Sequence, residues 1–159
     1  MRQKTLPERL AGIQILGIER GAAEWTVPAT GAGRGTCPAR GTPSDARHST
    51  YVRHLQDLPL QGVRVTVHLA VARLRCRNSR CARRVFAEPL PGTAEPRCRQ
   101  TRRLSDLVRL LGDNAGGRPA ERVLAHLGMP VSDDTVLRCL RRSAASHSGA
   151  SLRAVGIDD

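Results

Sequence analysis

The sequence predicts an α+β protein in which a small β-rich domain precedes an α-helical domain. Two observations support the β-rich domain. Apolar and polar residues alternate strictly over residues 63–71, which is typical of a half-buried strand, and two cysteines, Cys76 and Cys81, follow at the expected tip of a hairpin. One observation supports the helical domain: from residue 101 onward the apolar residues recur with the helical period.

Residues 1–36 are expected to form a short, loosely folded β lead-in. They contain two brief β-like runs, residues 13–18 and 25–27, and these are followed by a glycine-rich stretch without packing side chains. Nothing in this segment resembles the apolar core of a signal peptide, because charged residues such as Lys4 interrupt it.

The β-rich domain is expected over residues 37–90. Its clearest strand, residues 63–71, runs into the turn between Cys76 and Cys81, and residues 84–88 are the expected return strand of the hairpin. Prolines then break regular structure and mark residues 91–100 as a linker.

Three helices are expected over residues 101–143. The first ends near Gly112, the second begins at Pro119 and is closed by Gly128, and the third begins after Ser132, which can cap its amino end. The apolar stripe of the first helix consists of Leu104, Leu107, Val108 and Leu111.

The third expected helix has two chemically different sides. At 100° per residue its apolar residues cluster opposite three arginines, Arg138, Arg141 and Arg142. Two helices joined by a short glycine-containing turn are typical of a helix-turn-helix, whose second helix enters the major groove of DNA. Any surface helix of a cationic protein also carries arginines away from its core, and Asp134 can pair with Arg138 across one turn. We interpret this face as DNA-binding; a merely solvated face is the alternative.

The cysteines indicate a metal site. A β-turn that presents two thiolates, here Cys76 and Cys81, is how zinc ribbons hold half of their metal. Cys37 begins a similar turn, but Arg40 stands where a fourth ligand is expected, and a guanidinium has no lone pair to donate. Two interpretations stay open: buried thiols, the commoner role of such a pair, and a zinc site on Cys37, Cys76 and Cys81 that lacks its fourth ligand. Residues that could substitute for the fourth ligand are His48, His54 and Cys98.

Charge and composition favour a nucleic-acid partner. The 159 residues include 26 Lys and Arg against 14 Asp and Glu, a formal net charge of +12. A GC-rich coding sequence alone would explain why nearly all of these cations are arginine. With one Trp, one Tyr and one Phe, a base-stacking platform of the kind that binds single strands is not expected. No stretch approaches the roughly 20 apolar residues of a membrane span. The expected location is the cytoplasm.

Several blocks of the chain resemble the front part of a bacterial insertion-sequence transposase, of the family named ISL-three. The resemblance covers roughly residues 5–159 in the family's own order. The blocks that carry it are Cys37-Pro-Ala-Arg-Gly, His48-Ser-Thr-Tyr51, Leu55-Gln-Asp-Leu-Pro59, Arg75-Cys-Arg-Asn-Ser-Arg-Cys-Ala-Arg-Arg-Val-Phe86, Gly116-Gly-Arg and Val131-Ser-Asp-Asp-Thr135.

The resemblance implies a zinc-binding domain, a helix-turn-helix and a DDE nuclease domain in that order. Cys37, Cys76 and Cys81 match three of the family's four metal ligands, and Arg40 occupies the fourth position. The segment that contains Ser132, Thr135 and the three helix arginines matches the DNA-reading helix. Residues 144–159 resemble a linker and the first strand of the catalytic domain, where one of two aspartates, Asp158 or Asp159, would be the first metal-binding carboxylate.

The predicted function is duplex-DNA binding by a truncated transposase, at the terminal inverted repeats of its own element. Two-metal catalysis needs several converging carboxylates, which an aspartate pair alone does not supply. Arg77 and Arg80, at the arginine-rich hairpin tip, are expected to add phosphate contacts. The alternatives are the first part of an active nucleotidyltransferase that a frameshift or second chain completes, and a non-specific basic remnant. Expected protein partners are a second copy of the chain or a full-length transposase.

Overall fold

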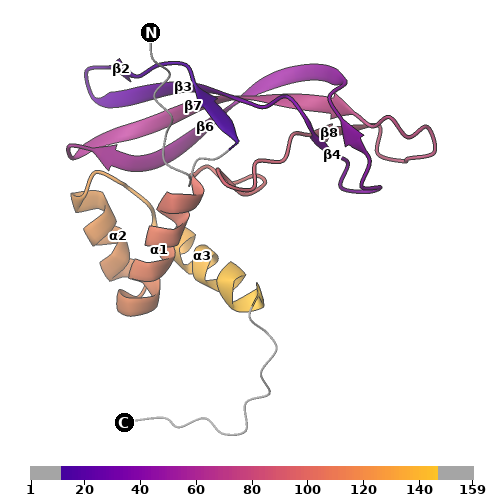
Figure 1. The fold of residues 1–159 in the computed structure, drawn as a ribbon. Coiled ribbons are helices and arrows are strands. Elements are labelled where there is room, and N and C mark those ends of the chain that lie inside the picture. Colours follow the sequence, from indigo (N-terminus) through magenta and orange to yellow (C-terminus); the bar gives the residue numbers. More distant parts are fainter. Residues whose placement is uncertain (1–11, 147–159) are drawn as a thin grey trace, which may run out of the picture.

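The structure is a computed structural model that describes residues 12–146. It is mixed α+β: a six-stranded sheet lies across the top of three helices, which gather beneath one end of it (Figure 1). The strands are β1 (Ile13–Ile15), β2 (Glu19–Arg20), β3 (Glu24–Gly31), β4 (Gly35–Thr36), β5 (Pro43–Ser44), β6 (Arg47–Leu60), β7 (Val63–Arg75) and β8 (Val85–Ala87), and the helices are α1 (Arg102–Ala115), α2 (Gly117–His126) and α3 (Asp133–Ser146).

The antiparallel hairpin of β6 and β7 contains the two longest strands of the sheet. The two strands have 14 and 13 residues and are joined by Gln61 and Gly62. The φ angles of these two residues, 53° and 75°, are both positive, as in the type I′ turns of two-residue hairpins. The expected strand at residues 63–71 is confirmed as part of β7. Its longest neighbour, β6, was not expected from the sequence.

The amino-terminal part is not a loosely folded lead-in, as the sequence predicted. β3 pairs in parallel with β7 from Glu24↔Arg64 to Thr30↔Ala70, and β1 and β2 pair with β3 in turn. Strand order in the main path is therefore β1-β3-β7-β6. The brief β-like runs do form strands, but long-range pairing makes β3 an inner strand of the sheet rather than a separate element.

The two faces of β7 bury different clusters. Successive side chains of a strand point to opposite faces, so Val65, Val67, Leu69 and Val71 share one face and pack with Leu55 and Leu90 in the larger core. At the far end the other face is buried, where Ala72 and Leu74 pack against Phe86 of β8 and two of the cysteines. The expected return strand is confirmed: β8 pairs with β7 through Leu74↔Phe86.

The three helices enclose a core of their own, as the apolar periods predict. Its buried members are Leu104, Val108, Ala120, Leu124, Met129, Val131 and Val136. Two boundaries differ from the prediction. α1 continues beyond Gly112 to Ala115, because Gly112 lies inside the helix against Val136 and Leu140 of α3 and lets the two helices approach closely. α2 begins at Gly117, two residues before Pro119.

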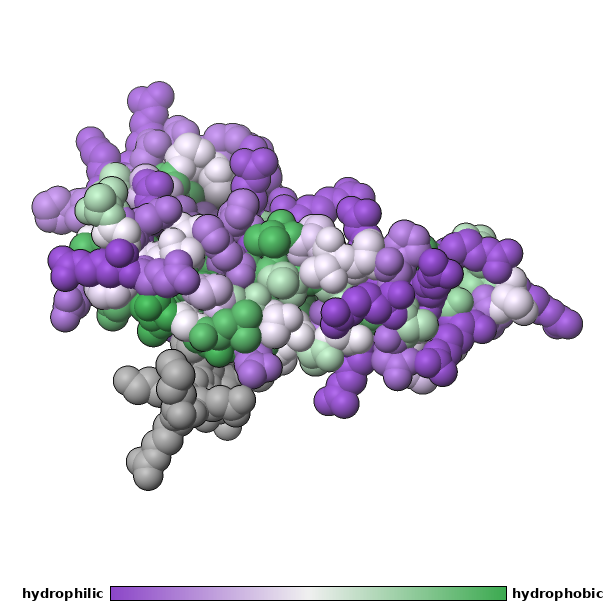
Figure 2. Space-filling view, turned by 90° about the horizontal axis from the view of Figure 1, so that it is seen from above, coloured by the Kyte–Doolittle hydropathy of each residue, from purple (hydrophilic) through white to green (hydrophobic). Residues whose placement is uncertain are grey.

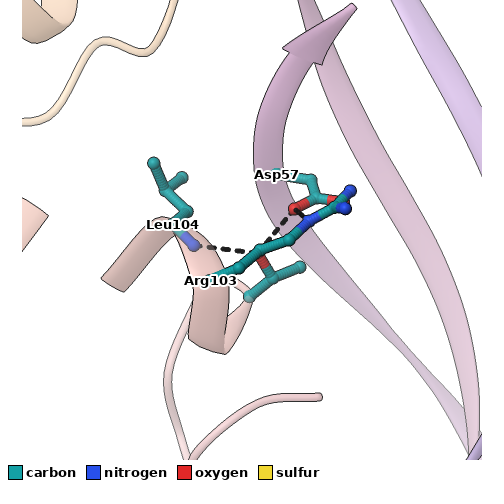
Figure 3. Close-up of polar contacts among 4 residues, drawn as sticks. Asp57, Arg103 and Leu104 are labelled. Atoms are coloured by element: carbon teal, nitrogen blue, oxygen red, sulfur yellow. Dashed lines mark hydrogen bonds and ion pairs between the residues drawn. The ribbon is translucent and has the colours of Figure 1, made fainter. Parts of the chain in front are cut away.

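A buried carboxylate joins the sheet to the helices (Figure 3). The Asp57 side chain, 2% exposed, accepts hydrogen bonds from Thr101 Oγ1 at 2.6 Å and from Arg103 Nε at 2.7 Å, and it forms an ion pair with Arg103. Thr101 Oγ1 in turn accepts from the backbone N–H of Leu104 at 3.4 Å and so caps α1. The end of β6 thereby fixes the first turn of the helical part.

Candidate functional site

Three cysteines from two loops converge at the end of the sheet that lies away from the helices. Cys37 follows β4, and Cys76 and Cys81 bracket the loop between β7 and β8; β4 and β8 are labelled at the end of the sheet away from the helices in Figure 1. All three sulfur atoms lie within 4.8 Å of one another, and the Sγ atoms of Cys37 and Cys81 are 3.8 Å apart. In a tetrahedral site with metal–sulfur bonds of about 2.3 Å, two sulfurs are about 3.8 Å apart. The cluster could therefore hold a metal ion.

The backbone around the cluster is arranged for thiolates. Burial raises the pKa of the Cys37 thiol, but hydrogen bonds from the backbone N–H groups of Ala39 and Arg40 and from the other two thiols outweigh it, and the pKa lies below its ordinary value. The N–H of Asn78 lowers the pKa of Cys76 in the same way, whereas burial and the neighbouring thiols raise it to a net value above the ordinary one. The coupled thiols therefore do not titrate alike: the pKa of Cys37 is lowered and the pKa of Cys76 is raised.

No fourth donor joins the cluster within residues 12–146. Among the His, Cys, Asp and Glu side chains described there, only the three cysteines form the group. Arg40 is exposed, and its backbone N–H donates to the Cys37 carbonyl in the turn. None of the expected substitutes takes the fourth position: His48 contacts Ser49, His54 packs against His68, and Cys98 lies beside Ser105.

A second candidate site is a cleft of about 410 Å³ between α3 and the segment that precedes α1. The expected DNA-binding residues Ser132, Thr135, Arg138 and Arg142 line one wall. Arg97 and Arg99 line the other. Ser132 Oγ accepts the backbone N–H of Thr135 at 3.4 Å and caps α3, which confirms the expected cap. Two guanidiniums of α3 and two of the segment before α1 thus line one cleft, and such a group of donors suits an anion.

The three helix arginines do not share one face. Arg138 and Arg142 line the cleft, whereas Arg141 lines a separate hollow beside Asp113 and Leu140. Arg138 is also paired with Asp134 one turn earlier, as the alternative interpretation expected. The apolar side of the helix is confirmed for Val136, which is fully buried, but Leu137 is 38% exposed.

A half-buried thiol, Cys139, also lines this cleft. Burial raises its pKa, the nearby Cys98 thiol adds to the effect, and Arg142 and Arg138 oppose it. The balance keeps Cys139 protonated at neutral pH, so the cleft keeps its net positive charge. The amide nitrogen of Gln56 lies in the same region, buried and without a hydrogen-bond partner among the residues that the structure describes.

The remaining predicted residues are dispersed. Arg77 and Arg80 are both exposed in the loop between β7 and β8; Arg77 forms an ion pair with Asp45, and Arg80 has its backbone N–H bonded to the Asn78 side chain. Asp158 and Asp159 lie outside the described residues, and so does the strand expected just before them. Lys4 also lies outside the described residues.

Sequence reasoning missed one wall of the cleft and the buried carboxylate that joins the sheet to α1. Arg97 and Arg99 belong to a segment predicted only as a linker, although it lies within the most cationic part of the sequence, between Arg73 and Arg103. Asp57 was not singled out either. Its signal is an acidic residue between Leu55 and Leu58, both of which contribute to cores.

Comparison with known proteins gave no match: no family model matches the chain, and neither the curated proteins nor the solved structures gave a match. Among the helices that the structure describes, none is long and apolar enough to cross a membrane.

Proposed function

We propose that this protein binds duplex DNA through α3, as the DNA-binding part of a transposase of the ISL-three kind. The observation that supports this most is the cleft, in which Arg138 and Arg142 of α3 face Arg97 and Arg99 across a space of about 410 Å³. In this proposal α2 and α3 act as a helix-turn-helix. The turn between them, residues 127–132, lets Met129 and Val131 enter the helical core.

In this proposal one side of α3 packs in the helical core and the other side contacts DNA. Val136 packs in the helical core and fixes the helix axis, so the opposite side is free to enter a major groove. Ser132 and Thr135, at the first turn, would bind backbone phosphate with the partial positive charge of the helix end. Arg142 and Arg138 would reach guanine edges, for which the forked guanidinium is suited, once Arg138 exchanges Asp134 for a base.

We further propose that Cys37, Cys76 and Cys81 bind zinc, which would supply cross-linking rather than catalysis. Three thiolates are soft ligands of the kind that zinc accepts, and Cys37 is separated from Cys81 by 44 residues of sequence. The metal would tie the turn after β4 to the hairpin tip. This would hold Arg77 and Arg80 in position for phosphate contacts.

Selection from a pool of random duplexes, followed by titration of the enriched duplex and a scrambled one at two salt concentrations, tests the proposal. We expect a preference on the order of a thousandfold for the enriched duplex, the lower end for specific binders. Arg142→Gln and Arg138→Gln should reduce this preference. The matched control is Arg109→Gln on α1, an exposed arginine whose guanidinium lies 3.7 Å from Asp113 and outside the cleft.

The hairpin tip offers the complementary test. Arg77→Gln and Arg80→Gln should weaken both duplexes alike and reduce the salt dependence by about one unit of slope each, because phosphate contacts carry no base information. Equal, steeply salt-dependent binding of enriched and scrambled duplexes by the native chain would contradict sequence-specific binding and favour a non-specific basic protein.

A further inference from the structure

A run of exposed arginines continues from the cleft along the outer edge of β6. The cleft shares Arg97, Cys98 and Arg99 with a neighbouring hollow of about 550 Å³, whose other lining residues are Tyr51, Arg53 and His54 of β6. Because the two hollows share residues, they form one concave surface. It begins on α3, crosses the segment before α1 and continues on the sheet.

The corner of this surface, formed by residues 95–101 before α1, is held against β6 by hydrogen bonds. The Arg53 guanidinium donates to the carbonyl oxygens of Glu95 at 2.9 Å and Cys98 at 2.7 Å. The backbone of Gln56 donates to the Arg99 carbonyl at 2.9 Å and accepts from Thr101 N at 3.0 Å, so residues 99–101 run beside β6 like an added strand. The side chains of Arg97 and Arg99 are exposed from a fixed backbone.

The backbone at the corner is strained in a way that favours a functional role. Arg97 has φ of 61°, a left-handed conformation that costs a residue with a side chain of order 1 kcal/mol. The surrounding hydrogen bonds of Arg53 maintain it. Such strain is concentrated at binding and catalytic sites, and here it presents a guanidinium to the concave surface.

Beyond Tyr51 the surface continues toward the cysteine end. The Arg73 guanidinium stacks over the Tyr51 ring at 5.0 Å, and Arg73 shares its strand face with Tyr51 and Arg53. Exposed arginines follow at Arg47 and Arg75. Figure 2, a view from above, shows hydrophilic side chains projecting at both ends of the molecule.

The length of the sheet sets the distance between the two ends of this surface. The turn after α2 abuts the β6–β7 turn, where Gly128 lies against the Gly62 carbonyl, and the cysteine cluster is at the opposite end of β7. The cleft reaches β6 at Gln56, which pairs with Thr66 of β7, so Arg73 and Arg75 lie further along that strand by roughly 23–30 Å, at about 3.3 Å per residue. One turn of B-form DNA is about 34–36 Å.

We propose that duplex DNA lies along the angle between α3 and the sheet that Figure 1 shows, and is contacted at two places within one helical turn of each other. α3 holds one contact, Arg73 and Arg75 hold the other, and Arg97 and Arg99 bind phosphates between them. This rests on the proposed function and adds the geometry of the partner. It requires a duplex of roughly 20 base pairs for full affinity, because a single helix-turn-helix covers about half of that.

The test is the affinity of the full chain for duplexes of increasing length centred on the selected site, from about 12 to about 24 base pairs. We expect affinity to rise until roughly 20 base pairs. Arg73→Gln should weaken the long duplexes severalfold and lower their salt slope by about one, and it should leave the shortest unchanged. The control is Arg64→Gln, an exposed arginine of the same strand that points to the opposite face.

The outcomes are distinguishable. Affinity that stops rising at about 12 base pairs, or equal losses from Arg73→Gln and Arg64→Gln, would overturn the two-contact geometry while leaving binding by α3 intact. Equal binding of duplex RNA of the same length would also overturn it, because the deep, narrow A-form groove does not admit α3. If Arg142→Gln has no effect at any length, the proposed function fails first. Thermal unfolding of each variant checks that the fold is retained.

Discussion

The two ends of the sheet are stabilised by different chemistry. At the helical end, seven buried apolar residues form a core, and the Asp57 carboxylate with Arg103 and Thr101 links that core to the sheet. At the cysteine end, the buried cluster consists of Cys37, Ala72, Leu74, Cys81 and Phe86, with a single aromatic ring and a single leucine. The cysteine end thus buries fewer apolar side chains than the helical end, and the proposed metal would stabilise it.

The difference also bears on the two proposed DNA contacts. α3 is fixed by Val136 in a full core, so its orientation follows from packing alone. The arginines proposed for the other contact, Arg73 and Arg75, lie at the end of β7 beside the smaller cysteine cluster, and the proposed zinc would tie Cys37 to the hairpin tip there. We expect metal ions to stabilise the cysteine end and to leave the stability of the helical end unchanged.

The largest effect is expected from removing the carboxylate that joins the two parts. Asp57→Ala leaves Arg103 and the Thr101 hydroxyl without their acceptor, and breaking a buried pair of this kind costs about 3–5 kcal/mol. We expect about 3 kcal/mol, the lower end, because the Arg103 side chain is 21% exposed. Urea unfolding measures it, and an unchanged midpoint would show that the two parts are independent.

Asp106→Ala is the matched control for Asp57→Ala. Asp106 is an acidic residue on α1, exposed and outside the network around Thr101. Its removal should change the free energy of unfolding by no more than about 0.5 kcal/mol. A comparable loss from both variants would mean that net charge, rather than the buried network, sets the stability.

The next effect is expected from the metal. Zinc at a hundredfold excess over its dissociation constant stabilises the native state by about 2.7 kcal/mol, and Cys81→Ser or a chelator should remove most of this gain. Because the ligands must lose their protons, the gain should also fall as the pH is lowered. Hydrogen exchange should speed up in β4, β5 and β8 on chelation and stay the same in α1–α3. Exchange that speeds up equally in the helices would remove the contrast between the two ends.

A smaller effect is expected from the close contact between α1 and α3. A Cβ added at Gly112 would lie 2.7 Å from Val136 Cγ1, so one of the two helices must shift. Gly112→Ala should therefore cost about 1–3 kcal/mol despite the better helix propensity of alanine. It should also weaken DNA binding by displacing α3. A stabilised variant with intact binding would show that α3 has room to adjust.

Local patterns predicted the elements whose signals lie within one stretch of chain. The strict alternation in β7, the helical periods around Leu104 and Leu124, and the cysteine turn are of this kind, and each is found where the sequence placed it. The parallel pairing of β3 with β7 joins residues 40 positions apart, from Glu24 to Arg64. No local period encodes such a partner, so the amino-terminal part was predicted as loose.

β6 was missed for a different reason. Its face toward the larger core includes Arg53, which donates to the Cys98 carbonyl before α1, and Asp57, which accepts from Thr101, so polar residues interrupt the apolar alternation. One signal was present in the sequence: Gln61 and Gly62 form a two-residue turn directly before the clearest strand.

The smallest expected effect restores what the cysteine end lacks. The backbone of the turn from Cys37 to Gly41 already directs the N–H groups of Ala39 and Arg40 at the Cys37 sulfur, so a thiol at position 40 would need little rearrangement to complete four ligands. Arg40→Cys should therefore raise the zinc affinity by at least tenfold, which corresponds to about 1.4 kcal/mol. Competition with a chromophoric chelator measures it. Ala39→Cys, one position away, is the control. A similar gain from both substitutions would mean that any nearby thiol suffices, whereas no gain from Arg40→Cys would mean that the three cysteines bind their metal without a fourth protein ligand.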